Sequence, residues 1–233
     1  MASIFKIILV SAAFTAASGA FAQKAGDNLV SLGLTSINPD AQVGPLTNSA
    51  GGAAQAAVDG ATASVSHETT VAVSWLRMYT DQVGVELVLG TPVTLTQDLT
   101  TPATGAHPAA AKMQLRGPAL IGKYFFGSHQ DAWRPYAGLG VAHVSFHNVE
   151  TNKADPIVQY LGGVDASFRS TWTPIYNAGV IRHINDTWSV DASVSYLPVK
   201  SVVTFVGQPG YGTTTGDIKL STTAYAIRLG YRF

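Results

Sequence analysis

His143, Ser145 and His147 lie at alternate positions of the segment HVSFHN (143–148), so they share one face if that segment is a strand. Such residues serve two kinds of chemistry, a serine nucleophile activated by histidine and a metal ion held by imidazole nitrogens. Strand positions two apart lie roughly 6.6 Å from each other, and positions four apart about 13 Å. These spacings exceed hydrogen-bond reach and the distance of about 2 Å between a histidine ligand and zinc. We therefore expect neither an enzyme nor a metal site here.

The glycines of GLGVAH (138–143) raise the possibility of a phosphate-binding loop. A dinucleotide fingerprint requires a third glycine and a following helix, but His143 occupies the place of that glycine. We expect Gly138 and Gly140 to relieve crowding between strands instead, and we predict no cofactor. Predicted loops or turns, where histidines are solvated, hold His67, His107 and His129.

The composition excludes several further functions. The 14 basic residues balance the 14 acidic residues, so net charge gives no argument for a nucleic-acid partner. Charged residues are only 12% of the chain, against a usual fraction of about 25%. The chain has no cysteine, which excludes disulfides, thiolate metal sites and a lipid-modified N-terminal cysteine.

The N-terminal segment has the three parts of a secretory signal peptide. A positive residue, Lys6, precedes an apolar run, and Ala20-Phe21-Ala22 forms a cleavage site of the small-x-small type. The apolar run is shorter than the roughly 20 residues that a membrane-spanning helix needs. We predict that residues 1–22 are a signal peptide and that residues 23–233 form one domain.

From Asn28 onward, apolar residues recur at every second position, which is typical of strands with one apolar face. Eight segments show this pattern: 28–35, 71–75, 83–90, 117–126, 133–146, 171–184, 187–199 and 220–233. Short links alternate with long ones rich in Pro, Gly, Thr and Asn. The short links are 80–82, 127–132 and 185–186, and the long links are 38–68, 91–114, 149–168 and 202–218.

The second face of these segments decides between two all-β folds. A β-sandwich would bury its apolar face against other large apolar side chains. Here the alternate positions carry Gly, Ser, Ala, Thr and an occasional charge. Strands of about ten residues with alternating short turns and long loops are typical of a bacterial outer-membrane barrel. We predict an all-β fold, an eight-stranded antiparallel up-and-down transmembrane β-barrel in the cell outer membrane, whose apolar face lipid covers.

Aromatic residues gather beside the short turns and the C-terminus, which lie at one rim of such a barrel. Aromatic girdles mark membrane interfaces. We expect a girdle at this periplasmic rim, made of Trp75, Tyr79, Tyr124, Phe125, Phe126, Trp133, Tyr136, Trp188, Tyr231 and Phe233.

Several motifs, in this order along the chain, resemble the OmpW family of small outer-membrane proteins. They are VGVELVLGTPV (83–93), ALIGKYFF (119–126), RPYAGLGVAH (134–143), NAGVIRHINDTWSVDASVSYLPVKS (177–201) and LGYRF (229–233). The resemblance implies a barrel with periplasmic termini, a narrow and partly hydrophobic lumen, and uptake of small apolar or weakly polar molecules. HVSFHN is similar to outer-membrane lipid A deacylases, but the Ser-Asn-x-Gly pattern of those enzymes does not follow it.

Alternation predicts that several charged residues point into the lumen. The lumen of an eight-stranded barrel is just wide enough for side chains to fill it. The residues either form ion pairs that hold the barrel closed or set the selectivity of a narrow pore. The lumen-lining candidates are Glu86, Lys123, Arg134, Tyr136, Asp191 and Arg228.

Two functions fit these features. The first is a porin-like passive channel or carrier for small, largely hydrophobic solutes. The second is a non-transporting surface protein whose long loops bind a partner, as in adhesion or as a phage or bacteriocin receptor. A lumen closed by paired side chains such as Glu86, Arg134 and Arg228 would favour the second function, and a continuous apolar cavity would favour the first.

The C-terminal segment LSTTAYAIRLGYRF (220–233) is expected to close the barrel by pairing with the first strand, which removes both free edges. Tyr231 and Phe233 resemble the terminal signal that the outer-membrane assembly machinery recognises. We expect a monomer with no nucleic-acid partner. The expected partners are outer-membrane lipid and lipopolysaccharide, the assembly machinery, and small hydrophobic solutes.

Overall fold

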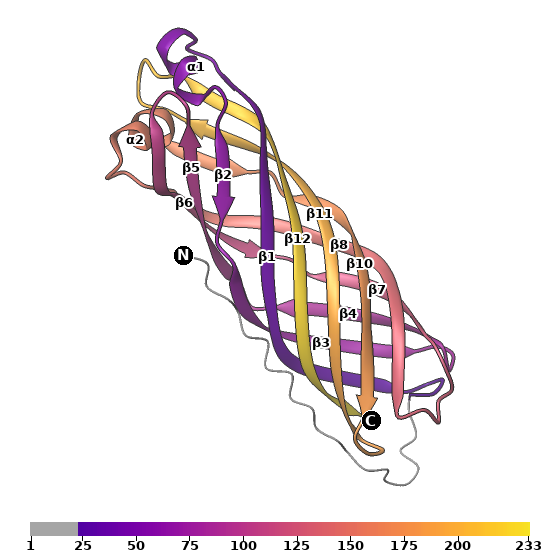
Figure 1. Ribbon diagram of the computed structural model, residues 1–233. Coiled ribbons are helices and arrows are strands. Elements are labelled where there is room, and N and C mark those ends of the chain that lie inside the picture. Colours follow the sequence, from indigo (N-terminus) through magenta and orange to yellow (C-terminus); the bar gives the residue numbers. More distant parts are fainter. Residues whose placement is uncertain (1–22) are drawn as a thin grey trace.

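The computed structural model describes residues 23–233, and the predicted signal peptide lies outside the described residues. Eight strands form a closed antiparallel ring, which confirms the predicted fold (Figure 1). The ring closes because β1 pairs with both β12 and β3, and β8 pairs with both β7 and β10. Its strands are β1 (Asn28–Asn48), β3 (Glu68–Met78), β4 (Val83–Gly90), β7 (Ala119–Phe125), β8 (Trp133–Thr151), β10 (Thr171–His183), β11 (Trp188–Val206) and β12 (Thr213–Arg232).

The long loops predicted at the other end of the barrel are largely structured, so that part of the prediction was wrong. Strands β1, β8, β11 and β12 continue far beyond the short strands β4 and β7 (Figure 1). A hairpin of β5 and β6 pairs with β2 on one side and β8 on the other, and β9 pairs with β11. We call this end, which is predicted to be extracellular, the extracellular extension; its added elements are α1 (Gly52–Val58), β2 (Thr62–Val65), β5 (Val93–Thr101), β6 (Gly105–Arg116), α2 (Pro156–Gly162) and β9 (Asp165–Phe168).

The lower half of the barrel, next to the short turns, is apolar outside and polar inside. On β12, Ile227 is 66% exposed whereas the next residue, Arg228, is 4% exposed. On β1, Leu32 is 59% exposed beside a buried Ser31. Since lipid covers the outer face of a membrane barrel, these outward apolar side chains need no protein partner.

The upper half has the opposite arrangement, because its outer face lies beyond the lipid hydrocarbon, among headgroups and water. Val199, Ile218 and Leu220 are buried inside the barrel, while Lys200 and Lys219 on the same strands are exposed. A large apolar cluster fills the extension. Its buried members are Leu46, Val58, Ala61, Val65, Val93, Leu95, Met113, Val144, Phe146, Phe168, Val199, Val203, Ile218 and Leu220. This core explains why the expected loops fold into strands.

Both helices lie in the extension. Helix α2 begins after Asp155, whose carboxylate accepts hydrogen bonds from the backbone N–H groups of Ile157 and Val158, and Pro156 occupies the first turn. Helix α1 lies within the segment 48–64, whose conformation the sequence left open. Within residues 23–233, no helix is long and apolar enough to cross a membrane.

Most of the predicted periplasmic aromatic residues face outward. Eight of the ten are exposed, among them Tyr79 at 66% and Trp133 at 55%. Phe125 and Tyr136 are instead buried in the lumen, so their assignment to the girdle was wrong. Each lies next in sequence to an exposed residue of its strand, and strand alternation therefore turns it inward.

Candidate functional site

Five of the six lumen-lining candidates meet in one buried group in the lower half, which we call the polar cluster. Lys123 Nζ lies 2.6 Å from Glu86 Oε2, and Arg228 Nη1 lies 3.2 Å from Glu86 Oε1. Arg228 Nη2 lies 2.8 Å from Asp191 Oδ1. The hydroxyl of Tyr136 donates to Asp191 Oδ2 at 2.7 Å, and Lys123 Nζ lies 4.1 Å from the centre of the Tyr136 ring. Two cations and two carboxylates thus neutralise one another across the lumen.

Glycines on neighbouring strands make room for these long side chains. Gly33 pairs with Arg228, and a Cβ at Gly33 would clash first with the backbone of β12 and would also lie only 2.8 Å from Arg228 Cγ. Gly179 pairs with Tyr136, and a Cβ there would lie 2.6 Å from the Tyr136 Cζ. The small residues of the inner face therefore let the polar cluster span a narrow barrel.

Arg134, the sixth candidate, is separate from the polar cluster. It is fully buried near the periplasmic end, where it donates to the backbone oxygens of Gln23 at 2.9 Å and Asp81 at 2.6 Å. Its guanidinium carbon lies 5.2 Å from the centre of the Phe125 ring. Arg134 thus joins the start of the described chain to the first short turn, and it has no recorded contact with Glu86 or Arg228.

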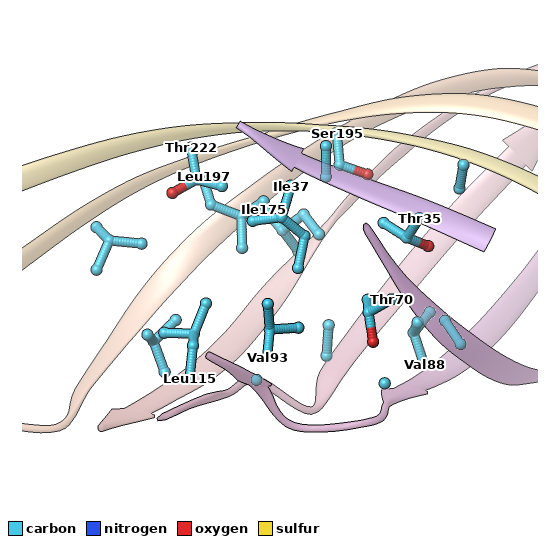
Figure 2. A pocket seen from close by; sticks show the side chains of 18 of the residues that line it. Thr35, Ile37, Thr70, Val88, Val93, Leu115, Ile175, Ser195, Leu197 and Thr222 are labelled. Carbon is cyan, nitrogen blue, oxygen red and sulfur yellow. The ribbon is translucent and has the colours of Figure 1, made fainter. Parts of the chain in front are cut away.

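An apolar cavity of about 150 Å³ lies next to the polar cluster, and Arg228 of that cluster is part of its lining. Figure 2 shows side chains from different strands converging on this space, with Ile175 and Leu197 on one side and Val93 and Leu115 on the other. The few polar groups of the lining are mostly hydroxyls. The residues labelled there are Thr35, Ile37, Thr70, Val88, Val93, Leu115, Ile175, Ser195, Leu197 and Thr222.

The cavity reaches the wall of the barrel where β4 and β7 separate. Their last recorded pair is Val88 with Ala119. Beyond it, Thr91 bonds back to β3, since its N–H donates to the Val71 oxygen at 2.9 Å. Gly90, Thr91 and Gly117 line the cavity and are exposed. The cavity thus lies beside this break in the strand pairing of the barrel wall.

The cavity was not predicted from the sequence, although the sequence carries a signal for it. Along β11, the apolar outward positions end at Tyr196, and large apolar residues then appear at the inward positions Leu197 and Val199. The same change of phase occurs on β12 between Leu220 and Tyr225. Where the large apolar residues of one strand move from outward to inward positions, the lumen becomes apolar.

A buried histidine joins two parts of the extracellular extension. His107 Nδ1 lies 2.8 Å from Asp155 Oδ2, and His107 Nε2 lies 2.8 Å from Thr104 Oγ1. His107 is 5% exposed, so its prediction as a solvated loop histidine was wrong. Burial by itself raises the pKa of the Asp155 carboxyl. Hydrogen bonds from His107, Val158 and Ile157, together with the charge of His107, lower this pKa by more than burial raises it. The pKa of Asp155 is therefore below the usual 3.8. The contact ties the β5–β6 hairpin to α2.

Ser145 Oγ lies 3.2 Å from His147 Nε2, so the expectation that these side chains cannot meet was wrong. The pairing of β6 with β8 shifts register close by, and Asn148 has a positive φ of 49°, which departs from regular strand geometry. His143 packs instead against the Trp172 ring, with ring centres 4.8 Å apart. Among residues 23–233, no carboxylate is recorded against His147, so the third group of a catalytic triad is missing.

A family model decides to which proteins this barrel is related. The model described as the OmpW family matches residues 24–233. The chain belongs to the OmpW family. The family resemblance predicted from the sequence is therefore confirmed, and the protein is an outer-membrane protein of a Gram-negative bacterium.

Relatives within the OmpW family align over almost their full length. Outer membrane protein W of Escherichia coli (strain K12) is 28% identical over 214 residues, which cover 92% of this chain and 92% of that protein. Outer membrane protein W of Salmonella typhi has the same identity and coverage. The crystal structure of OprG from Pseudomonas aeruginosa superposes with a TM-score of 0.79 at 23% identity, covering 91% of this chain and 98% of that one. The family and the solved neighbours are outer-membrane barrels, not enzymes.

The C-terminal strand of this OmpW family member closes the ring as expected. Phe233 N–H donates to the Asn28 oxygen at 3.0 Å, and Asn28 N–H donates back to the Phe233 oxygen at 3.3 Å. The side chains of Tyr231 and Phe233 face outward, and Tyr231 packs edge-on against Trp188. Recognition of these two residues by the assembly machinery stays a prediction.

Proposed function

We propose that this OmpW family member is a passive carrier for small, largely hydrophobic solutes, which bind in the apolar cavity. One observation carries the proposal, the position of an apolar cavity of about 150 Å³ next to a closed polar cluster. An apolar cavity of roughly 150 Å³ in a protein core is large enough to bind benzene. The proposed solutes are therefore of the size of a single aromatic ring or a short hydrocarbon.

The polar cluster argues against a route straight through the barrel. An apolar solute that displaced Lys123 from Glu86 would leave buried charges unpaired, at a cost of several kcal/mol. An apolar solute offers no hydrogen bond in return. We therefore infer that the solute leaves the cavity sideways and does not continue to the periplasm.

The wall between β4 and β7 is the inferred exit. Gly90 lies seven positions above Val83 at the short turn, or about 18 Å along the barrel axis at a strand tilt near 40°. This height is within the apolar band of about 25 Å. A solute that passes Gly90 and Gly117 would enter the hydrocarbon core of the outer membrane, where it is soluble.

Filling the cavity tests the proposal. Ala224 lines the cavity, and Ala224→Phe would occupy the solute's space. Ala192 on the neighbouring strand β11 is exposed on the lipid face, so Ala192→Phe makes the same change without touching the cavity. Uptake of a radiolabelled monocyclic aromatic compound would be measured in cells that produce equal amounts of each folded variant.

We expect Ala224→Phe to lower uptake to the level of cells without the protein, and Ala192→Phe to leave it unchanged. Binding of the same compound to the purified barrel should follow the same order. Wild-type uptake by Ala224→Phe would exclude the cavity as the route. If cells with and without the protein take up the compound equally, the non-transporting surface protein becomes the better hypothesis, with the polar cluster serving only to hold the barrel closed.

A further inference from the structure

Two lysines stand directly opposite each other on the outer surface of the barrel. Lys200 on β11 pairs with Lys219 on β12, and both are exposed. Directly opposed strand residues have Cα atoms about 4.5–5.5 Å apart. Like charges in this position are destabilising unless an anion lies between them. Within residues 23–233, no ion pair is recorded for either lysine.

The height of this pair on the barrel is set by the strands. Twelve positions separate Lys200 from Trp188 on β11, and twelve separate Lys219 from Tyr231 on β12. Twelve positions correspond to about 40 Å along a strand, or about 30 Å along the axis at a tilt near 40°. Since the apolar band of an outer-membrane barrel is about 25 Å tall, both ammonium groups lie just beyond it, in the headgroup layer of the outer leaflet.

The residues between confirm the transition from lipid to headgroup. The outward side chains Val194 and Tyr225 are 40% and 57% exposed, as expected for a lipid-facing surface. Pro198 on β11 and Ser221 on β12 follow as a directly opposed pair, two positions before the two lysines and on the same face. The charges thus begin where the apolar surface ends.

A third cation lies beside the pair. The backbone N–H of Arg169 donates to the Val202 oxygen at 3.0 Å, so Arg169 is about two positions further out along β11 than Lys200, and it is exposed. Two carboxylates are near, since Asp40 and Asp217 lie diagonally beside Lys219 and Lys200 on the neighbouring strands. Neither is recorded in an ion pair among the described residues.

We propose that Lys200 and Lys219, with Arg169, bind a phosphate group of the phosphorylated glycolipid in the outer leaflet, in the manner of lipid A. A phosphate between the two ammonium groups would remove their mutual repulsion and form charge-assisted hydrogen bonds with both. The acyl chains of the same lipid would lie on the apolar surface below, against Val194 and Tyr225. The site is independent of the proposed solute cavity, because it lies on the opposite side of the strand wall.

Removing the charges tests this site. The variant Lys200→Gln/Lys219→Gln would be compared with Lys112→Gln/Lys153→Gln, which removes two exposed lysines from the extension and makes the same charge change. Native mass spectrometry would measure retention of diphosphorylated lipid A by each purified barrel. Heat-dependent gel mobility would show that each variant is folded. Dephosphorylated lipid A and inorganic phosphate serve as separate probes.

We expect the Lys200/Lys219 variant to bind diphosphorylated lipid A at least about tenfold more weakly, since each lost charge-assisted hydrogen bond corresponds to about that factor. The Lys112/Lys153 variant should bind as wild type, and dephosphorylated lipid A should bind all proteins equally. Asp217→Asn, which removes a nearby negative charge, should strengthen binding.

Three results would overturn the proposal. The first is equal weakening by both double variants, which would indicate only a general charge effect. The second is competition by inorganic phosphate at the concentration of the lipid, which would indicate a site for free phosphate. The third is weaker binding by Asp217→Asn, which would indicate a metal ion held by the carboxylate in place of direct contact with the lysines.

Discussion

The two halves of the barrel bury opposite kinds of side chain although the same strands run through both. In the lower half, β12 turns Ile227 and Leu229 outward and Arg228 inward. In the upper half, it turns Lys219 outward and buries Ile218 and Leu220. The medium outside changes from lipid hydrocarbon to the headgroup layer and water between these heights, and the inward face changes with it.

The two halves also fill the lumen differently, the lower half with paired charges and the upper half with apolar side chains. In the lower half, lipid contacts the apolar residues, so the lumen can hold charges, provided that they are paired as Glu86, Lys123, Asp191 and Arg228 are. The extension is covered by water and packs an apolar core as a soluble protein does. The cavity lies at the junction, where neither kind of packing is complete.

Breaking the polar cluster should have the largest effect. Glu86→Gln leaves Lys123 without a carboxylate and removes one of the two carboxylates that hold Arg228. Breaking a buried ion pair by removing one partner costs about 3–5 kcal/mol. The free energy of unfolding would be measured by denaturant titration in lipid vesicles.

Asp40→Asn is the control for this prediction, because Asp40 is an exposed carboxylate on β1. We expect it to change the free energy of unfolding by less than about 0.5 kcal/mol. Equal stability of Glu86→Gln and Asp40→Asn would contradict this prediction. It would mean that water solvates the charges of the lower lumen, so that they do not need to be paired.

A polar side chain in the upper half should have a smaller effect on stability and a large effect on binding. Ile175 is 5% exposed and lines the cavity. Ile175→Asn places an amide without a partner there, at a cost of about 1–3 kcal/mol. It should also weaken binding of an apolar aromatic probe, which fluorescence titration of the purified barrel can measure.

Ile175→Val tests the apolar character of the same position. It keeps the surface apolar and removes one methylene group, for a cost of about 0.5–1.5 kcal/mol. Probe binding should remain. Equal binding by the asparagine and valine variants would show that apolar contact at Ile175 does not determine what the cavity accepts.

The smallest effect on stability is expected in the extracellular extension, at the carboxylate of Asp155. Because the pKa of Asp155 is lower in the folded protein than the usual 3.8, its contribution is complete above that pH and is lost as the pH falls through the lowered pKa. Asp155→Ala also removes the N-cap of α2, at a cost of about 1 kcal/mol. Hydrogen exchange of α2 should therefore accelerate in this variant at neutral pH.

Asp155→Asn separates the charge from the cap, since asparagine is also a good N-cap. In this variant, the amides of α2 should stay protected from hydrogen exchange at neutral pH. Acid should lower that protection in the wild type but not in the variant. The lower half has no part in this contact, so exchange in the lower strands should stay unchanged. A change there would mean that the two halves are coupled.

Much of the fold could be predicted because lipid-facing strands have a simple pattern. Alternation, the short turns and the terminal Phe233 gave the eight ring strands and their closure. The inward position of Arg228 and Glu86 follows from the same alternation. Their pairing across the lumen does not, since Glu86 and Arg228 lie on strands separated by β1 and β3.

The extension could not be predicted in the same way. Its strands bury apolar residues on the opposite face, so the outward apolar pattern ends there, and residues 202–218 were predicted to be a long loop. His107 and Asp155 are 48 residues apart, and only the packing of α2 on the β5–β6 hairpin brings them together. The cavity depends on both halves, and it was therefore missed.

The pairing of β1 with β12 has a consequence for biogenesis. Leu29 on β1 lies opposite Arg232 on β12, so closure of the ring joins its first and last strands. Pairing of such high contact order is slow, because the whole intervening chain must be ordered first. Until synthesis is complete, the chain would carry an unpaired edge and an apolar face with no lipid to cover it. We expect such a chain to become stable only where lipid covers its apolar face and its last strand can pair with its first.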